Sequence, residues 1–185
     1  MSRSTRFVRL SFLGFALLLA LAAPAFAELS APQLTPAMLT LLPEVKLRGG
    51  GEQTFLGLSI YEGYYWGPGG AWSPDQPFAL QLFYHRRFYG TTIAERSLEE
   101  MAKLGYGTPR QRERWGEQMK RIFPDVDEGD CLIGVNLPHE GARFFRNGEP
   151  IGSIDDRDFA RAFFAIWLDP RTSAPELRKR LLGEP

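Results

Sequence analysis

Residue types that commonly do chemistry are sparse in this sequence, and none of them forms a recognisable catalytic set. His85 and His139 have no cysteine, histidine or glutamate around them at a metal-ligand spacing. Cys131 is the single cysteine, so neither a disulfide framework nor a thiolate zinc site can form. Ser97 and Ser153 lack a nearby base and a nucleophile-elbow motif. We therefore expect no metal site and no cofactor, and the sequence assigns no catalytic residue.

Charged side chains beside apolar positions are the remaining candidates for a site. Alternation along an expected strand at 78–88 places Arg86 on the same face as Leu82 and Tyr84. A buried guanidinium requires an internal carboxylate or a bound anion as its partner. A bulge or an early end of the strand would instead let Arg86 reach water. The sequence leaves both alternatives open.

The composition is that of one ordinary globular domain. Of the 185 residues, 44% are apolar, and 22 lysines and arginines balance 22 aspartates and glutamates. Balanced charge gives no long-range attraction to nucleic acid or to acidic membranes, and the apolar share argues against disorder. We therefore expect no nucleic-acid partner.

The N-terminus has the pattern of a secretory signal peptide. Three arginines within residues 3–9 precede an uncharged apolar run at 10–23, and residues 25–27 have the small-x-small spacing that signal peptidase recognises. The apolar run is shorter than the roughly 20 residues that a membrane-spanning helix needs. We expect residues 1–27 to be cleaved between Ala27 and Glu28, giving a periplasmic protein in a Gram-negative cell, with no membrane span. An uncleaved anchor and a buried core helix are the alternatives.

Local patterns predict the elements that position the candidate residues. A proline-rich stretch at 28–43 has no periodicity and is expected to be loosely ordered. Gly49–Gly51 is expected to form the turn of a first hairpin that continues at 53–65. A capping box of Thr92 and Glu95 predicts the start of the first long helix. The remaining expected elements are a helix at 108–122, strands near 131–137, 142–146 and 149–154, a core helix around 159–167 and a last helix capped at 173–176.

The order of these elements indicates an α+β fold. Strands, two helices, strands and two helices follow one another, which is typical of an antiparallel sheet with helices packed over one face. Asn147-Gly148 is the strongest hairpin signal, and its turn would pair Arg146 with Glu149. Pro150 removes an N–H from the following strand, which indicates an exposed sheet edge that could receive a protein partner.

Three segments resemble the exported bacterial branch of the chalcone isomerase-like family. They are residues 47–66 (LRGGGEQTFLGLSIYEGYYW), 78–104 (FALQLFYHRRFYGTTIAERSLEEMAKL) and 129–168 (GDCLIGVNLPHEGARFFRNGEPIGSIDDRDFARAFFAIWL). The resemblance implies an open-faced β-sandwich over residues 44–185, in which helices lie over one side of a large antiparallel sheet and a ligand cleft separates the layers.

The resemblance implies the fold without the catalytic set of the plant enzymes. Plant chalcone isomerases use an Arg and a Thr on the first strands, and a Tyr and an Asn seven residues apart at the first helix. The matched helix positions hold Ile93 and Glu100, while Leu56 stands in place of the Thr and the Arg position falls near Pro43. Leucine and isoleucine cannot supply the hydrogen bonds of a hydroxyl and a phenol.

The same match orients the first long helix. If Ile93 and Glu100 face the cleft, Arg96 and Ser97 lie on that face too. Arg96 is then either a ligand-binding residue or the partner of a structural salt bridge with Glu100 or Glu99.

Three functions are compatible with these observations. The first is a non-catalytic periplasmic protein that binds a small apolar or amphipathic ligand in the cleft, as fatty-acid-binding members of the fold do. The candidate binding residues are Arg96, Arg86, Tyr84, Glu100 and Ser97. The second is an isomerase or intramolecular lyase on another substrate, using Arg96, Glu100 or Tyr84. The third is a protein-interaction module that uses its exposed sheet edge.

Overall fold

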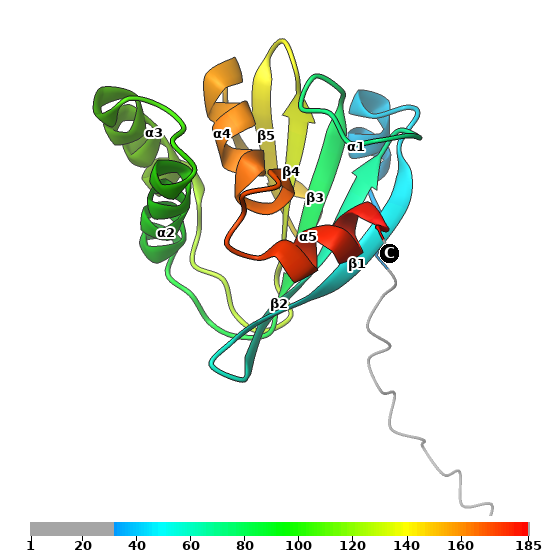
Figure 1. Cartoon of the computed structure of the whole chain (residues 1–185), viewed down its shortest axis with the longest axis horizontal. Helices are drawn as coiled ribbons and strands as arrows, with labels where there is room; N and C mark the ends of the chain where they lie inside the picture. Colours follow the sequence, from blue (N-terminus) through cyan, green and yellow to red (C-terminus); the bar gives the residue numbers. More distant parts are fainter. Residues whose placement is uncertain (1–31, 185) are drawn as a thin grey trace, which may run out of the picture. The chain divides into compact units, whose positions relative to one another are not determined.

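A computed structural model of the chain describes residues 32–184, and its centre is a six-stranded antiparallel sheet (Figure 1). The strands follow one another in the order β1-β2-β3-β4-β5-β6, so every neighbour in the sheet is also a neighbour in sequence. The strands are β1 (Lys46–Phe55), β2 (Leu58–Gly67), β3 (Phe78–Tyr84), β4 (Cys131–Leu137), β5 (Gly141–Arg146) and β6 (Glu149–Ile154). The helices are α1 (Pro36–Leu41), α2 (Gly90–Lys103), α3 (Pro109–Ile122), α4 (Arg157–Leu168) and α5 (Pro175–Leu182).

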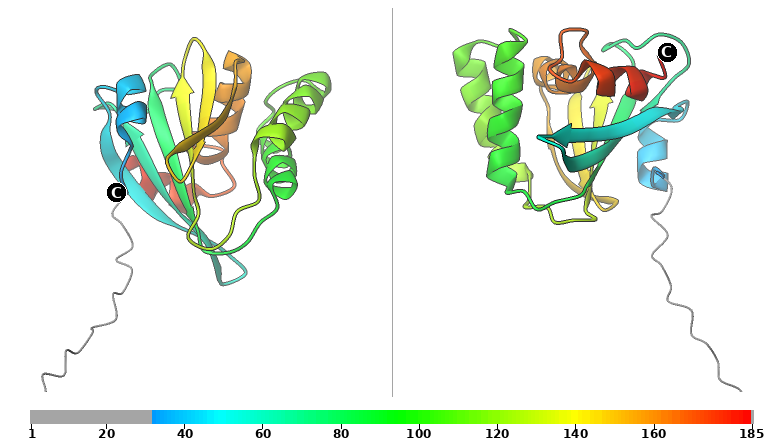
Figure 2. Two further views of the ribbon diagram at one scale, coloured as in Figure 1. Left: turned by 180° about the vertical axis from the view of Figure 1, so that it is seen from behind. Right: turned by 60° about the horizontal axis from the view of Figure 1, so that its bottom comes forward.

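Helices α2 to α5 cover one face of the sheet, which confirms the predicted α+β architecture (Figures 1 and 2). The central helix is α4, whose buried aromatic residues Phe159, Phe163 and Phe164 pack on the strands. The carboxylate of Asp156 starts this helix by accepting hydrogen bonds from the backbone N–H groups of Asp158 and Phe159, at 2.9 and 3.1 Å. The expected core helix is therefore confirmed.

The opposite face of the sheet is covered by α1. Met38 and Leu42 are fully buried there against Ile133 and Val135 of β4. The part of the proline-rich stretch that the structure describes is therefore a packed segment. Cys131 lies in the same layer, where burial raises the pKa of its thiol to about 11. The expected signal peptide and its cleavage site at Ala27 and Glu28 lie outside the described residues.

The prediction of a turn at Gly49–Gly51 is wrong, because these glycines lie within β1. A Cβ atom on Gly49 would stand 2.1 Å from the carbonyl oxygen of Arg180, so the glycine allows α5 to lie directly on β1. The hairpin turns instead at Leu56 and Gly57, whose φ angles are 50° and 77°. Close packing by a helix distant in sequence, and not a turn, explains the glycine run.

The boundaries around the first long helix also differ from prediction. Strand β3 ends at Tyr84 instead of Phe88, and α2 begins at Gly90 without a side-chain cap of its own. The carboxylate of Asp125 accepts the hydrogen bond of the Gly90 N–H at 2.9 Å and so replaces the predicted Thr92–Glu95 capping box.

Two other helix starts give one confirmation and one correction. Thr108 and Gln111 form the reciprocal capping box that starts α3, as predicted. The predicted serine cap of α5 is wrong, because Ala174 is its N-cap and the Ser173 hydroxyl bonds to the Glu100 carboxylate on α2 instead.

The last hairpin and the sheet edge agree with the sequence. Arg146 pairs with Glu149 across the Asn147-Gly148 turn, where Asn147 has a φ of 50°. Strand β6, which contains Pro150, lies at the end of the sheet. None of the helices within residues 32–184 is long and apolar enough to cross a lipid bilayer.

Candidate functional site

A cavity of ≈ 620 Å³ lies between the helix-covered face of the sheet and helices α2 and α4. Its volume is within the range of about 300–1,000 Å³ that is typical of small-molecule sites. Most of the lining is apolar and comes from the strands, from α2, and from the aromatic face of α4. The apolar lining residues include Ile60, Leu80, Leu82, Phe88, Ile93, Phe123, Leu132, Phe144, Ile151, Phe163, Phe164, Ile166 and Trp167.

Two tyrosines, one partly buried and one buried, line the sheet side of the cavity. Tyr61 of β2 and Tyr84 of β3 are directly paired across the strands, and their rings meet edge to face with centroids 5.9 Å apart. The indole N–H of Trp167 donates a hydrogen bond to the Tyr61 hydroxyl at 2.9 Å, which leaves that hydroxyl free to donate its own hydrogen. Burial raises the pKa of Tyr61 to about 12 and raises the pKa of Tyr84 as well. Both phenols are therefore neutral hydrogen-bond donors at physiological pH.

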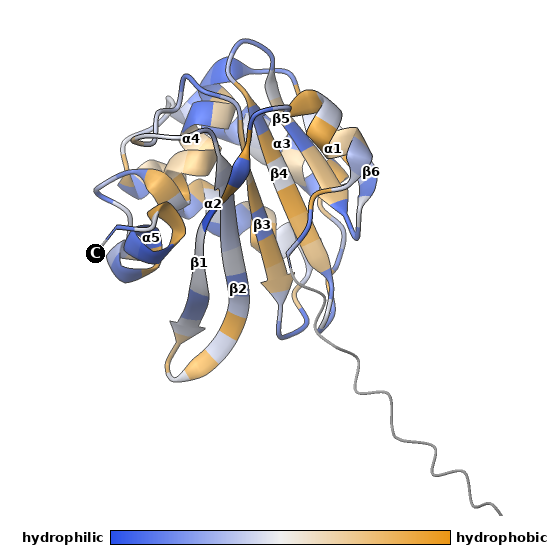
Figure 3. Ribbon diagram, turned by 90° about the vertical axis from the view of Figure 1, so that its right-hand side faces the viewer, coloured by the Kyte–Doolittle hydropathy of each residue, from blue (hydrophilic) through white to orange (hydrophobic). Residues whose placement is uncertain are grey.

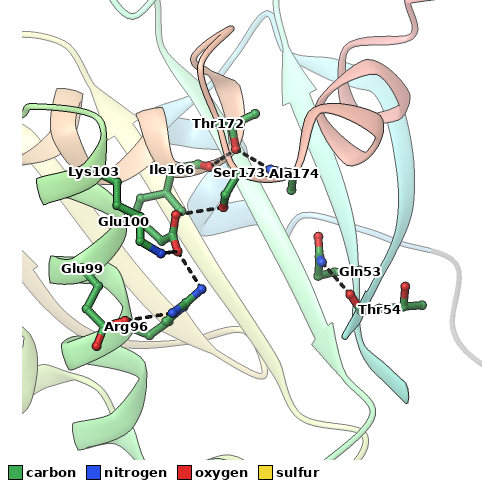
Figure 4. Close-up of polar contacts among 10 residues, drawn as sticks. All are labelled: Gln53, Thr54, Arg96, Glu99, Glu100, Lys103, Ile166, Thr172, Ser173 and Ala174. Atoms are coloured by element: carbon green, nitrogen blue, oxygen red, sulfur yellow. Dashed lines mark hydrogen bonds and ion pairs between the residues drawn. The ribbon is translucent and has the colours of Figure 1, made fainter. Parts of the chain in front are cut away.

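The polar side of the cavity is centred on Glu100 of α2 (Figure 4). Only 7% of its side chain is exposed. Its carboxylate forms salt bridges with Nη2 of Arg96 at 2.8 Å and with Nζ of Lys103 at 2.9 Å. It also accepts a hydrogen bond from the Ser173 hydroxyl at 2.8 Å. Burial raises the pKa of Glu100, but the hydrogen bonds from Lys103 and Ser173 and the charges of Arg96 and Lys103 outweigh that effect and hold it below its ordinary value. The carboxylate is thus ionised and compensated within the protein.

Arg96 lines the cavity and also completes a salt-bridge network. Its Nη1 atom contacts Glu99 and its Nη2 atom contacts Glu100, both at 2.8 Å. The sequence offered ligand binding or a salt bridge as alternatives for this arginine, and the salt bridges are present. The neighbouring Ser97 also lines the cavity, where its hydroxyl donates to the carbonyl oxygen of Ile93 at 2.8 Å.

Four of the five candidate residues line the same cavity, namely Tyr84, Arg96, Ser97 and Glu100. Arg86 lies outside it, because β3 ends at Tyr84 and the chain turns away. The Arg86 side chain is exposed, and its Nε atom donates to the carbonyl oxygen of Ser59 at 2.9 Å. The second sequence alternative, an early strand end that lets Arg86 reach water, is therefore the one observed.

The sequence does not reveal most of the cavity wall, including the hydrogen-bonding residues Tyr61, Trp167 and Ser173. The sequence does not indicate Tyr61, because the glycines at 49–51 predict a turn ahead of the one observed. With the turn at Leu56-Gly57, β2 starts at Leu58 and Tyr61 pairs with Tyr84. Trp167 falls within the expected core helix, and Ser173 within the expected cap of the last helix. The alternation of β2, counted from the correct turn, is the signal that could have found Tyr61.

The same hairpin turn places Leu56 outside the cavity wall. Its side chain is 85% exposed, so it does not occupy the cleft position that the plant threonine would have. Ile93, in contrast, lines the cavity as expected from the matched helix motif. Among the residues that the structure describes, no group of three or more His, Cys, Asp or Glu side chains could hold a metal ion.

Comparison with known families agrees with this arrangement of sheet, helices and cavity. The sequence profile described as chalcone isomerase-like matches residues 80–183, more than half of the chain. The chain belongs to the chalcone isomerase-like family. Among curated proteins no sequence matches it.

Solved structures include a similar fold in a fatty-acid binding protein of Arabidopsis thaliana. It shares 11% sequence identity with this chalcone isomerase-like chain at a TM-score of 0.58, over 75% of this chain and 87% of that one. At this identity the likeness concerns the fold alone. The family profile confirms the resemblance to the chalcone isomerase-like family, and the structural match confirms the expected open sheet.

Proposed function

We propose that this protein is a non-catalytic binding protein that holds an amphipathic ligand with a long aliphatic chain, such as a fatty acid, in the cavity between the sheet and α2. The observation that carries this proposal is the cavity of ≈ 620 Å³ with its largely apolar lining. An open volume of this size holds roughly 20 water molecules, and an aliphatic chain that displaced them would gain about 0.8 kcal/mol per buried methylene group.

The polar groups of the cavity support a binding role. Tyr61 and Tyr84 are neutral donors that can hold an oxygen atom at the polar end of a ligand. Glu100 is already neutralised by Arg96 and Lys103, so no free carboxylate base faces the cavity at this point. Together these contacts favour a ligand held by hydrogen bonds over a substrate that loses a proton.

The family relationship and the fold of the plant fatty-acid binding protein support the same class of ligand. The isomerase alternative has weaker support, since Ile93 presents an apolar side chain to the cavity where the resemblance would require a phenol. We further propose that the chain is exported to the periplasm after cleavage behind Ala27.

Trp167 provides a natural reporter for the test. Its indole lines the cavity and is hydrogen-bonded to Tyr61, so an occupant should change its fluorescence. We expect saturated fatty acids of increasing length to bind with saturable fluorescence changes. Each added methylene should tighten binding about fourfold, from about 0.8 kcal/mol per group, until the cavity is full. Native mass spectrometry of the purified protein would show the corresponding one-to-one complex.

A cavity-filling variant separates binding in the cavity from adsorption elsewhere. Ser97 is buried and lines the cavity, so Ser97→Phe should reduce affinity at least tenfold. Thr91→Phe, on an exposed position of the same helix, is the matched control and should bind as the wild type does. Circular dichroism confirms that both variants are folded. Unchanged affinity in a folded Ser97→Phe variant, or no dependence on chain length, would refute the proposal.

A further inference from the structure

The most exposed apolar residues of the described chain include the tip of the β1–β2 hairpin. Leu56 is 85% exposed, Phe55 63% and Leu58 48%, and Tyr89 at the start of α2 is 58% exposed. Figure 3 shows the apolar end of this hairpin, and Figures 1 and 2 show it projecting beyond the neighbouring strands. A Cβ atom added to Gly57 would meet no other atom within 4 Å, so the tip stands in open solvent.

The conformation of the hairpin does not explain why its turn contains a leucine at position 56. Leu56 has a φ of 50°, a left-handed conformation that disfavours a leucine. The Asn147-Gly148 turn has the same first φ angle but uses asparagine, whose side chain bonds to the Cys131 N–H and to Asp130 at 2.8 Å. Leu56 gains no such bonds and buries little surface. Its role must therefore lie outside the fold of the isolated chain.

The hairpin tip is continuous with the mouth of the cavity. Phe55 lines the cavity although its side chain is mostly exposed. Ile60 and Phe88 line both the cavity and a shallow surface depression that also includes Leu58. An apolar ligand can thus pass from the tip to the cavity along apolar side chains.

We propose that the β1–β2 hairpin tip docks on the surface of a phospholipid bilayer, from which the cavity takes up its ligand or to which it returns it. The ligand named in this inference rests on the proposed function. The docking of the hairpin on the bilayer does not. A projecting two-residue turn suits insertion between lipid headgroups, where exposed apolar side chains gain contact with acyl chains. It offers far less than the roughly 800 Å² that one side of a stable protein interface buries.

The charges beside the tip identify the type of surface. Arg86 and Arg87 border the depression together with Asp127 and Glu128, and Arg87 is paired with Asp127 at 3.7 Å. Opposite charges in equal number give no net attraction to anionic lipids. Docking should therefore be driven by apolar insertion and should take place on zwitterionic bilayers.

The test is flotation of the ligand-free protein with vesicles of pure phosphatidylcholine, compared with vesicles that contain phosphatidylglycerol. We expect the wild type to float with both, to within twofold, and to do so equally at low and high salt. The double variant Leu56→Asn/Leu58→Thr keeps residues suited to the turn and the strand, does not alter the cavity lining, and should float at least fivefold less. Leu39→Ser, at a 44% exposed leucine on α1, is the matched control and should float like the wild type.

Fatty-acid titration in vesicle-free buffer distinguishes failure of this inference from failure of the proposed function. The double variant should bind fatty acids with wild-type affinity, whereas its transfer of a fluorescent fatty acid to vesicles should be slowed at least fivefold. Equal flotation of the wild type and the double variant would overturn the inference, as would flotation only with anionic lipids. A dimer in light scattering that depends on Leu56 would instead identify a second copy as the occupant and would also overturn it. If the wild type itself did not bind fatty acids, only the proposed function would be overturned.

Discussion

Replacing Glu100 by glutamine tests whether the polar side of the cavity is a structural network or a binding group. The Glu100 carboxylate is almost fully buried and joins α2 to the loop before α5 through Ser173. Glu100→Gln keeps the shape of the side chain and one acceptor oxygen but removes the charge. Glu99→Gln is the matched control, because Glu99 contacts the same arginine while 59% of its side chain is exposed.

The expected loss of stability follows from the exposure of the partners. Arg96 and Lys103 are 59% and 55% exposed, so each can turn to solvent, and each contact is worth about 0.2–1 kcal/mol. The hydrogen bond from Ser173 adds about 1 kcal/mol. We therefore expect Glu100→Gln to lower the free energy of unfolding at pH 7 by about 1–3 kcal/mol, which is roughly 3–9 °C in Tm for a domain of this size. Glu99→Gln should cost no more than about 0.5 kcal/mol.

The pH dependence gives a second, independent signature. The pKa of Glu100 is lower in the folded protein than in the unfolded chain, so its stabilisation is fully present above the unfolded pKa of about 4.3. It is lost as the pH falls through the folded pKa. Urea unfolding at pH 7, 5.5 and 4 should therefore show a Glu100→Gln deficit that is constant between pH 7 and 5.5 and begins to shrink at pH 4.

Two results would refute this reasoning. If Glu100→Gln were as stable as the wild type at pH 7, or more stable, the cost of burying the carboxylate would exceed the gain from its three contacts. Glu100 would then be held at the expense of stability, as expected of a ligand-binding group. If Glu99→Gln cost as much as Glu100→Gln, burial of the carboxylate would not be the decisive factor.

Four further predictions can be checked with the same protein. Tyr61→Phe and Tyr84→Phe should each weaken fatty-acid binding by about 0.5–1.5 kcal/mol, or roughly 2- to 10-fold in Trp167 fluorescence titrations, and unchanged affinity would remove the phenols from the site. Leu56→Asn should raise the free energy of unfolding by about 0.5–1 kcal/mol in urea, because asparagine tolerates the left-handed turn, and destabilisation would contradict that account. The purified protein should not accelerate ring closure of chalcones in an absorbance assay, and a saturable rate would show that the matched catalytic positions are out of register. Intact-mass measurement on a periplasmic extract should give a chain that starts at Glu28, whereas recovery of the full-length chain in the membrane fraction would indicate an anchor.

Residues whose role depends on near neighbours in sequence could be predicted. Thr108 and Gln111 lie three residues apart and cap α3 as expected, since both partners of the capping box belong to the same turn. Asn147-Gly148 sets its own backbone conformation and thereby the Arg146–Glu149 pairing. Strand alternation predicted the orientation of Tyr84, whereas Arg96, Ser97 and Glu100 were placed toward the cleft only by the family resemblance, from which helix spacing then followed.

Residues whose partners are distant in sequence could not be predicted. Gly49 has the local pattern of a turn glycine. Its actual role is to make room for the backbone of α5, which lies about 130 residues later in the chain. The N–H of Gly90 is capped by Asp125 and not by the nearby Thr92. Ser173 does not cap α5, because Ala174 occupies the N-cap position and the Ser173 hydroxyl lies beside Glu100, to which it donates a hydrogen bond.

The sequence by itself determined the order of most of the elements and the α+β architecture, because periodicity, caps and turn residues act over a few positions. The family followed from the resemblance of three sequence segments and from the matching family profile. Only the tertiary structure decided that the first hairpin turns at Leu56, that Tyr61 and Trp167 meet in the cavity wall, and that Arg86 points away from it. Each of these outcomes depends on which residues of separate strands and helices come within a few ångströms of one another. Packing between distant segments sets those distances, and no local pattern in the chain encodes them.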